Sequence, residues 1–232
     1  MEFRCVECGF QLASDKALFI QYSPGNIRLM KCENCKAVAD EYIECEIMIL
    51  LIDLVLHKPK AYRHLLYNLL NRQVVNLEGL FWKSISAFLL LDAFTILVLN
   101  WSEENWSLSV SFSSLVLGCT KMLMNLLLRN FMFLCILLLA NRYFLDAHVG
   151  VSRCTDILFA IFVSSYLKIF LITMLVWEFP YSVLFIIDMF VLSSNVVALK
   201  AVMTESSIGK CIGTCFSAHA VKWLLHFICQ DH

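Results

Sequence analysis

Four cysteines near the N-terminus have the spacing of a metal site. Cys5 and Cys8 form one CxxC pair, and Cys32 and Cys35 form a second pair after 23 intervening residues. Two residues between cysteines let both thiolates of a pair turn toward one cation, and two such pairs complete a tetrahedral set of four sulfurs. This donor set suits zinc and leaves no coordination position for a substrate. The sequence therefore predicts a structural zinc site.

The segment between the two pairs is predicted to form a hairpin. The stretches Ala17–Tyr22 and Ile27–Cys32 flank Ser23-Pro24-Gly25-Asn26, which has Pro and Gly at the central positions of a type II turn. Two CxxC knuckles on a short hairpin make a zinc ribbon, which we place at residues 1–38. Unrelated free thiols or a redox CxxC pair are the alternative. Because so small a domain buries little apolar area, zinc should supply much of its folding free energy, about 10–16 kcal/mol by analogy with zinc-finger peptides.

The charges divide the chain into a polar first third and an apolar remainder. Residues 1–83 hold 10 Lys/Arg and 10 Asp/Glu of the 18 and 19 in the chain, which leaves 8 and 9 for the other 149 residues. With 60% hydrophobic and 16% charged residues, the chain does not have the composition of a soluble enzyme. The net charge of −1 gives no electrostatic reason to expect nucleic acid as a partner. A thiol-rich N-terminus without a signal peptide is expected to lie in the reducing cytosol.

A helical extension is predicted over residues 39–80. The apolar run Ile47–Leu56, interrupted only by Asp53, makes a helix of about 15 Å, half the hydrocarbon thickness of a bilayer. It is therefore a core helix or one in the membrane interface. A second helix, Ala61–Arg72, follows Pro59 and has apolar residues at helical spacing.

Three stretches in this extension, together with the ribbon, resemble the Arv family of endoplasmic-reticulum membrane proteins. They are Asp40-x-Tyr42-Ile43-Glu44, Ile52-Asp53-Leu54 and Lys58-x-Lys60-Ala61-Tyr62-Arg63-His64-Leu65-Leu66-Tyr67-Asn68. From these we take as family-motif residues Asp40, Tyr42, Tyr62, Arg63, His64 and Asn68. Recognisable motifs cover about residues 4–71, and beyond them only the general plan of several membrane helices is shared.

The resemblance implies a role in lipid homeostasis. Its expected elements are movement or distribution of sterols, effects on sphingolipids, and supply of glycosylphosphatidylinositol intermediates. It also implies that the family's zinc ligands fall on the four cysteines of the two CxxC pairs. Membrane lipids and lipid-biosynthetic enzymes are the expected partners.

About four membrane helices are predicted over residues 81–200. Four apolar segments are each about 20 residues long, enough for 30 Å of helix: Phe81–Asn100, Lys121–Ala140, Asp156–Trp177 and Tyr181–Lys200. Lys and Arg flank one set of ends, and the loops Trp101–Thr120 and Glu178–Pro180 hold none, so the N-terminus is predicted to be cytosolic. The first of these loops carries sequons at Asn100 and Asn105, and the alternation over Trp106–Phe112 predicts a strand.

Four ionisable residues fall near the middle of these segments, namely Asp92, Arg129, Lys168 and Asp188. A charge at that depth costs at least about 2.5–3.5 kcal/mol if it faces lipid, so we expect pairing inside a bundle. We predict the pairs Asp92–Arg129 and Lys168–Asp188, which either line a polar cleft for lipid headgroups or only fix how the helices pack.

The last segment, 201–232, is predicted to be one amphipathic or membrane-spanning helix. One face of it carries Cys and His residues and a lysine: Cys211, Cys215, His219, Lys222, His226 and Cys229. A second metal site, palmitoylated thiols, or the wetter side of a membrane-surface helix would each account for this face.

The expected fold is an N-terminal cytosolic zinc ribbon with short helices, followed by a multi-pass helical bundle. The expected function is non-enzymatic lipid handling, because no nucleophile with a plausible base, phosphate loop or acidic metal site is present. A lipid acyltransferase or glycosyltransferase, and a membrane-anchored adaptor for such an enzyme, are the alternatives.

Overall fold

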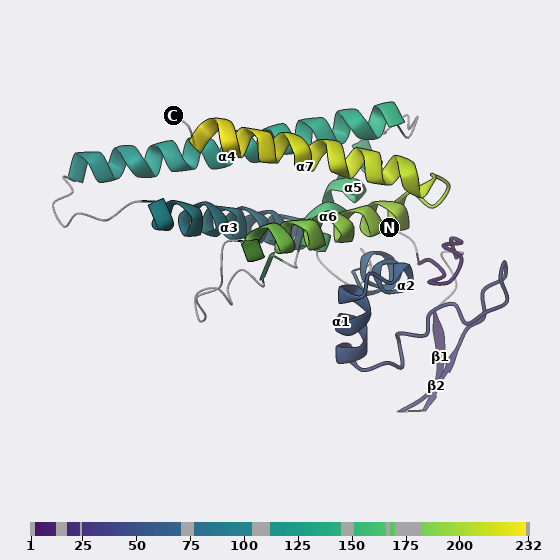
Figure 1. Cartoon of the computed structure of the whole chain (residues 1–232). Coiled ribbons are helices and arrows are strands. Elements are labelled where there is room, and N and C mark those ends of the chain that lie inside the picture. Colours follow the sequence, from purple (N-terminus) through teal and green to yellow (C-terminus); the bar gives the residue numbers. More distant parts are fainter. Residues whose placement is uncertain are drawn as a thin grey trace.

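A computed structural model describes residues 3–12, 18–23, 25–70, 77–103, 112–144, 151–165, 168–169 and 182–230. Its helices and strands, in chain order, are β1 (Phe19–Ser23), β2 (Asn26–Leu29), α1 (Ile47–Val55), α2 (Pro59–Arg63), η1 (His64–Leu69), α3 (Leu77–Glu103), α4 (Phe112–Phe144), α5 (Val151–Ser164), α6 (Ser182–Val202) and α7 (Ile208–Gln230). The long helices α3, α4, α6 and α7 run side by side, and the hairpin, α1 and α2 lie beside one end of this bundle (Figure 1).

The predicted hairpin forms, although its strands are short. β1 and β2 are antiparallel, with Phe19 opposite Leu29 and Gln21 opposite Ile27. The turn holds Gly25 at φ +82°, the value that the third residue of a type II turn requires and that glycine adopts without strain. The hairpin thus connects the two cysteine pairs as the sequence predicts.

α1 begins at the predicted residue, ends at Val55 and is closed by His57. This residue adopts φ +57°, which closes the helix with a hydrogen bond from the backbone N–H of Lys58 to the carbonyl of Asp53 (3.0 Å). Pro59 then begins α2, where its fixed φ and missing N–H fit a first helical position.

The second predicted helix is interrupted by a π-helix. α2 ends at Arg63 and η1 continues as six π-helical residues, closed by the bond from Leu70 N–H to Leu65 C=O (3.1 Å). π-Helical turns are rare and frequently lie at functional sites, and this one contains two of the family-motif residues, His64 and Asn68.

Among the described residues, three helices are long and apolar enough to cross a membrane. They contain the segments Gly79–Ile96, Val116–Phe144 and Val183–Val202, within α3, α4 and α6. The prediction of a fourth span at Asp156–Trp177 is not supported there, because α5 has 14 residues, about 21 Å, and ends at Ser164. The rest of that segment, apart from residues 165 and 168–169, lies outside the described residues.

α7 packs along α4 with its predicted Cys/His face turned inward. Cys211 and Cys215 have no exposed area and share a core with Phe133 and Leu137 of α4 (Figure 1). The interpretation of this face as the wetter side of a surface helix, or as a site of acylation on these two thiols, is therefore wrong. The side chains of His226 and Cys229 lie outside the described residues.

Two predictions for the loop after α3 fall on undescribed residues. The side chains of both sequon asparagines, and residues 106–111 of the predicted strand, lie outside the described part of the chain. Phe112, the last residue of that predicted strand, is the first residue of α4. The strand therefore stays a prediction for residues 106–111.

Candidate metal centre and buried polar clusters

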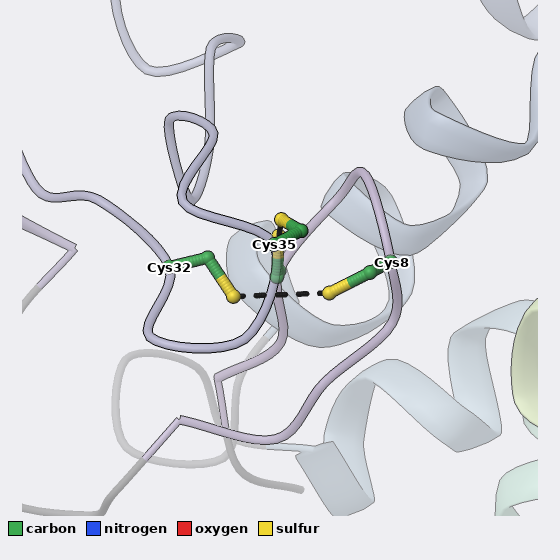
Figure 2. Close-up of side chains that lie close together, drawn as sticks. Cys8, Cys32 and Cys35 are labelled. Atoms are coloured by element: carbon green, nitrogen blue, oxygen red, sulfur yellow. Dashed lines mark hydrogen bonds between the residues drawn. The ribbon is translucent and has the colours of Figure 1, made fainter.

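The four predicted cysteine ligands converge on one point. The Sγ atoms of Cys5 and Cys35 are 3.7 Å apart, as are those of Cys8 and Cys32, and all four Sγ atoms lie within 4.8 Å of one another. Figure 2 shows the sulfurs of Cys8 and Cys32 facing each other with Cys35 beside them. Four sulfurs about 2.3 Å from one tetrahedral zinc would be about 3.8 Å apart. The geometry therefore fits a metal ion of zinc's size, and a separation of 3.7 Å is far too long for a disulfide.

The two CxxC knuckles have the same backbone geometry. In the first, the N–H of Cys5 donates to the carbonyl of Phe10 (2.9 Å), and in the second the N–H of Cys32 donates to that of Ala37 (2.8 Å). The residue after each pair turns the chain back with a positive φ, +77° at Gly9 and +64° at Lys36. Its backbone N–H donates to the backbone carbonyl of the first cysteine of its pair. The repeated geometry presents four sulfurs to a single cation.

The electrostatics within the cluster differ from one thiol to another. Burial raises the pKa of Cys5 to about 12. Burial acts in the same direction on Cys8, but hydrogen bonds from the Phe10 backbone N–H and the Asn34 side chain outweigh it and lower its pKa to about 7. Because a bound metal takes thiolates, the buried Cys5 proton must be displaced on binding, which makes affinity depend on pH.

Asp40 is the centre of the family-motif cluster. Its carboxylate is fully buried and accepts hydrogen bonds from the Tyr42 backbone N–H (3.0 Å), the His64 Nδ1 (2.7 Å) and the Asn68 Nδ2 (2.6 Å). The carboxylate can only accept, so the proton of the His64 ring that faces it is on Nδ1. The carboxylate thereby fastens the ribbon's end to η1.

Asn68 and Arg63 continue this contact to the ribbon backbone. The Asn68 side chain accepts from the Arg4 N–H (3.0 Å) and donates to the Arg4 carbonyl (2.9 Å), which is the pairing that a neighbouring strand would make. The Arg63 guanidinium donates to the carbonyls of Val6 (2.8 Å) and Glu7 (2.7 Å), inside the first knuckle. These side chains make hydrogen bonds to backbone N–H and carbonyl groups of the ribbon, which would otherwise need water as their partner.

The first knuckle also approaches the α6–α7 loop too closely for a side chain. A Cβ on Gly9 would lie 2.8 Å from the Thr204 methyl group, in addition to its positive φ. Gly9 is thus needed both for the knuckle turn and for the contact between ribbon and bundle.

Tyr42 and Tyr62 attach the first short helix to its neighbours. The Tyr42 hydroxyl donates to the Asp53 carboxylate (2.8 Å), and burial together with that carboxylate raises the pKa of Tyr42, so the hydroxyl keeps its proton. The Tyr62 hydroxyl is 3.2 Å from the Leu54 carbonyl and 2.7 Å from the Ser194 Oγ of α6. All six motif residues therefore connect the ribbon, the short helices and the bundle.

A second buried carboxylate, Asp92 of α3, lies inside the bundle. It forms ion pairs with Lys168, which follows α5, and with Lys222 of α7. Lys222 also donates to the Asn130 side chain of α4 (3.2 Å). Both ammonium groups lie over the face of Phe88, at 4.5 and 4.9 Å from the ring centroid, where they gain cation–π attraction.

The four predicted intramembrane residues meet at one cavity, but the ion pairs of Asp92 are with Lys168 and Lys222, and its predicted pairing with Arg129 stays a prediction. Asp92, Arg129, Lys168 and Asp188 all line one cavity, together with Thr95, His219, Lys222 and Trp223. We predicted that Lys168 pairs with Asp188. Its ion pair is instead with Asp92, while Asp188 accepts a long hydrogen bond from the Trp223 indole (3.4 Å). The cavity has about 20 Å³, room for roughly one water molecule and none for a lipid headgroup.

A chain of polar contacts connects the motif to this bundle. From Tyr62 it passes to Ser194, whose Oγ donates to the Ser164 carbonyl (2.8 Å); the Ser164 Oγ then donates to the Asn195 Oδ1 (2.6 Å). The Asn195 side chain lies 3.0 Å from Nε2 of His219, which lines the cavity.

Comparison with known proteins identifies the family. A sequence model of the Arv1-like family matches residues 4–199. The chain belongs to the Arv1-like family. The match extends well beyond the motifs of residues 4–71 into the membrane helices α3, α4 and α6, so it covers both the ribbon and most of the bundle.

Three relatives illustrate the range of similarity. The chain is 53% identical over 224 residues to Protein ARV 1 of Arabidopsis thaliana, covering 97% of this chain and 87% of the relative. It is 29% identical over 224 residues to Protein ARV1 of Homo sapiens, covering 87% and 73%. It is 29% identical over 209 residues to Protein arv1 of Schizosaccharomyces pombe, covering 84% and 73%. These names state no enzymatic activity, and no solved structure matches the chain.

Sequence reasoning missed several members of the two buried polar clusters. Arg4, Asn130 and Asn195 carried no recognisable signal, because a single polar residue in an apolar or irregular stretch does not indicate its partner. Lys222 was noted on the inward face of α7, but nothing in its spacing showed that this face meets Asp92. In the described part of the chain, the N-terminal cysteines are the group of metal-ligating side chains close enough to hold an ion.

Proposed function

We propose that this member of the Arv1-like family mediates sterol homeostasis in the endoplasmic-reticulum membrane. It acts in intracellular sterol transport and distribution between membranes, with effects on sphingolipids and on delivery of glycosylphosphatidylinositol intermediates. The observation that carries the proposal is family membership over residues 4–199, joined to three helices able to cross a membrane. The protein is a multi-pass membrane protein with its N-terminus in the cytosol, an orientation supported by the Lys and Arg residues at the helix ends on the ribbon side.

Zinc is the proposed metal of the ribbon. The four-thiolate donor set and the 3.7 Å separations support it, since zinc prefers this set and forms closed tetrahedral sites with it. When bound, zinc would fix the two knuckles relative to each other. Cys5, Cys8, Cys32 and Cys35 then hold the first knuckle in the position where Gly9 and Arg63 contact the rest of the protein.

Lipids are the proposed ligands, and they do not enter the polar cavity. The cavity volume of about 20 Å³ supports a role of the Asp92 cluster in holding the helices together. A sterol would have to be bound at a surface of the bundle that faces lipid. Transport without a nucleotide site would run down a concentration gradient or depend on a partner.

A second candidate function is that of an adaptor for a lipid-modifying or glycosyltransferase complex. The hairpin favours it, because every residue of β1 is exposed and Tyr22 is 64% exposed, so the ribbon has a free surface for a protein partner. In that case the metal site would set the shape of a docking surface.

The proposal is tested in cells that lack their own family member. The chain, its Cys32→Ser variant and a matched Cys45→Ser control are expressed at equal levels, and sterol is measured in endoplasmic-reticulum and plasma-membrane fractions. The unchanged chain and the Cys45 variant should restore the distribution, and the Cys32 variant should not. Failure of the unchanged chain to alter sterol distribution would contradict the proposal. The adaptor would be favoured if the chain restored the sterol distribution only when a lipid-modifying enzyme is also present.

A further inference from the structure

The short helix α1 exposes apolar side chains almost all round. Of its nine residues, six are at least one-third exposed and all six are apolar. They are Ile47, Met48, Ile49, Leu51, Ile52 and Val55, and Leu56 after the helix end is 62% exposed. A helix in water normally turns charged or polar side chains outward, so this surface requires an apolar environment.

The single charge on α1 is turned away from this surface. The Asp53 side chain is 12% exposed and forms an ion pair with Lys58 (2.7 Å) as well as the bond from Tyr42. These two contacts satisfy the carboxylate without water. The exposed face of α1 itself therefore carries no charge that would oppose contact with hydrocarbon, and the half-exposed charge nearest to it is the Lys58 ammonium, three residues after the helix.

The contacts of α1 with α6 fix the depth at which it lies. His57, directly after α1, places Nε2 3.0 Å from the Ser193 hydroxyl and stacks its ring on Phe190 at 6.1 Å between centroids. Ser193 lies in the middle of the segment Val183–Val202, about 15 Å along the helix from its first residue and about 14 Å from its last. If α6 crosses the bilayer, the end of α1 is near the centre of the hydrocarbon.

The rest of α1 lies between that depth and the ribbon. Its inward residues Leu50 and Leu54 belong to the same core as Ala198 and Ala201, near the end of α6 that approaches the ribbon. In Figure 1, α1 runs across the direction of α6 rather than along it. At nine residues, about 14 Å, it is too short to cross a bilayer by itself.

Exposed apolar side chains of α6 lie next to the residue that closes α1. On the same stretch of α6, Phe185, Ile186, Met189 and Phe190 are all at least 36% exposed, and Phe190 contacts His57. We propose that α1 is embedded in the lipid bilayer, in the leaflet on the ribbon side, with its exposed apolar face against acyl chains. The ribbon is then fixed at the membrane surface by an immersed helix as well as by its hydrogen bonds. This inference depends on α6 spanning the membrane and not on the sterol role.

A photoreactive amino acid tests which molecule contacts this face. It is introduced in place of Ile52 (54% exposed) in the full chain and, as a matched control, in place of Ile20 on β1 (42% exposed). Each protein is reconstituted in phosphatidylcholine nanodiscs with one chain per disc and in liposomes at higher density. Only samples with the elution volume and helix content of the unmodified chain are irradiated. Covalent adducts are identified by mass spectrometry.

The probe at position 52 should give phosphatidylcholine adducts in both preparations, several times more than the probe at position 20. Crosslinking of position 52 to a second copy in liposomes, without lipid adducts in nanodiscs, would overturn the proposal in favour of a dimer interface. Equal lipid adducts at the two positions would overturn it too, because contact would not be particular to α1. A low lipid yield at position 52, no greater than at position 20, would place α1 in water and overturn it as well.

Discussion

Asp40 and Asp92 are both buried carboxylates that join separate parts of the chain, yet they do so with different chemistry. Asp40 accepts from a backbone N–H, an imidazole and an amide, all within 28 residues of it along the chain. Asp92 is held by two ammonium groups, 76 and 130 residues away. The first cluster lies between a metal site and a short helix, and the second lies among helices in the membrane region.

The difference reflects what each environment tolerates. The donors around Asp40 make hydrogen bonds that water could replace if the ribbon moved away. In a hydrocarbon environment no such replacement exists, so the charges of the bundle neutralise one another directly. The ribbon should therefore come loose reversibly, whereas the bundle should fail as a unit.

The largest effect should come from removing the metal site. This change should unfold the ribbon and leave the bundle folded. Cys32→Ser leaves three thiolates and should remove most of the zinc contribution to ribbon folding, about 10–16 kcal/mol for zinc-finger peptides. We expect loss of bound zinc in native mass spectra and rapid tryptic cleavage at Lys31 and Lys36. The helical circular dichroism of the bundle should be nearly unchanged.

Cys45→Ser is the matched control, because Cys45 lies outside the sulfur cluster and its thiol donates to the carbonyl of Glu41, a bond that a serine hydroxyl can also make. It should keep one zinc per chain. Full zinc retention by Cys32→Ser would show that the four-thiolate site is wrong.

The next largest effect should come from neutralising Asp92. Asp92→Asn leaves Lys168 and Lys222 facing each other without their shared counter-charge, and breaking a buried pair in this way costs about 3–5 kcal/mol. The measurement is the midpoint of thermal unfolding in mild detergent, followed by helix content. Asp188→Asn is the control and should change the midpoint little, because Asp188 is only half-buried and accepts a 3.4 Å bond. Equal shifts for the two variants would contradict the role given to Asp92.

A smaller effect is expected at Asp40. Asp40→Asn turns an amide N–H₂ toward the donors His64 and Asn68, and leaving such buried groups unsatisfied costs about 1–3 kcal/mol. Zinc should remain bound, but hydrogen exchange at the Arg4 and Val6 amides should accelerate as the ribbon detaches from η1. Glu41→Gln, at an exposed neighbour, is the control. Unchanged exchange in Asp40→Asn would show that the carboxylate does not hold the ribbon.

The same contrast explains what could be predicted from the sequence. The CxxC spacing and the Pro-Gly turn are local signals, so the cysteine cluster and the hairpin were found. The motif residues around Asp40 were found only by resemblance to the family, and their docking role required the structure. Counting residues along apolar segments predicted a similar depth for Asp92, Arg129, Lys168 and Asp188, and the structure brings all four to one cavity.

Depth alone does not specify which way a side chain points. The pairing of Lys168 was therefore wrong, since the position of α7 and its Lys222 around the bundle leaves no trace in an apolar segment. The fourth span stays a prediction, because residues 166–167 and 170–177 of that segment lie outside the described residues. Hydropathy continued through Asp156–Trp177, whereas the regular helix α5 ends at Ser164, where serine side chains bond to Asn195 of α6.

The smallest effect should appear at the exposed edge of the ribbon. Its ion pairs should respond to salt, whereas the buried charges of the bundle should not. Lys60 forms ion pairs with Glu7 (2.5 Å) and Glu41 (3.4 Å), and the hydrogen bond to Glu7 raises the pKa of Lys60. A raised pKa means that this contribution to stability is complete below the pKa of the unfolded chain and is lost only as pH rises through the folded value. Near neutral pH this contribution to stability should therefore respond to salt and not to pH.

Because all three side chains are more than one-third exposed, Lys60→Met should cost less than about 1 kcal/mol. That cost should shrink as salt is raised to 1 M, where the screening length falls to about 3 Å. Asp92→Asn, with its charges buried, should keep its full cost under the same salt. A salt-independent cost for Lys60→Met in thermal unfolding would mean that its methylene packing, and not its charge, holds the ribbon edge.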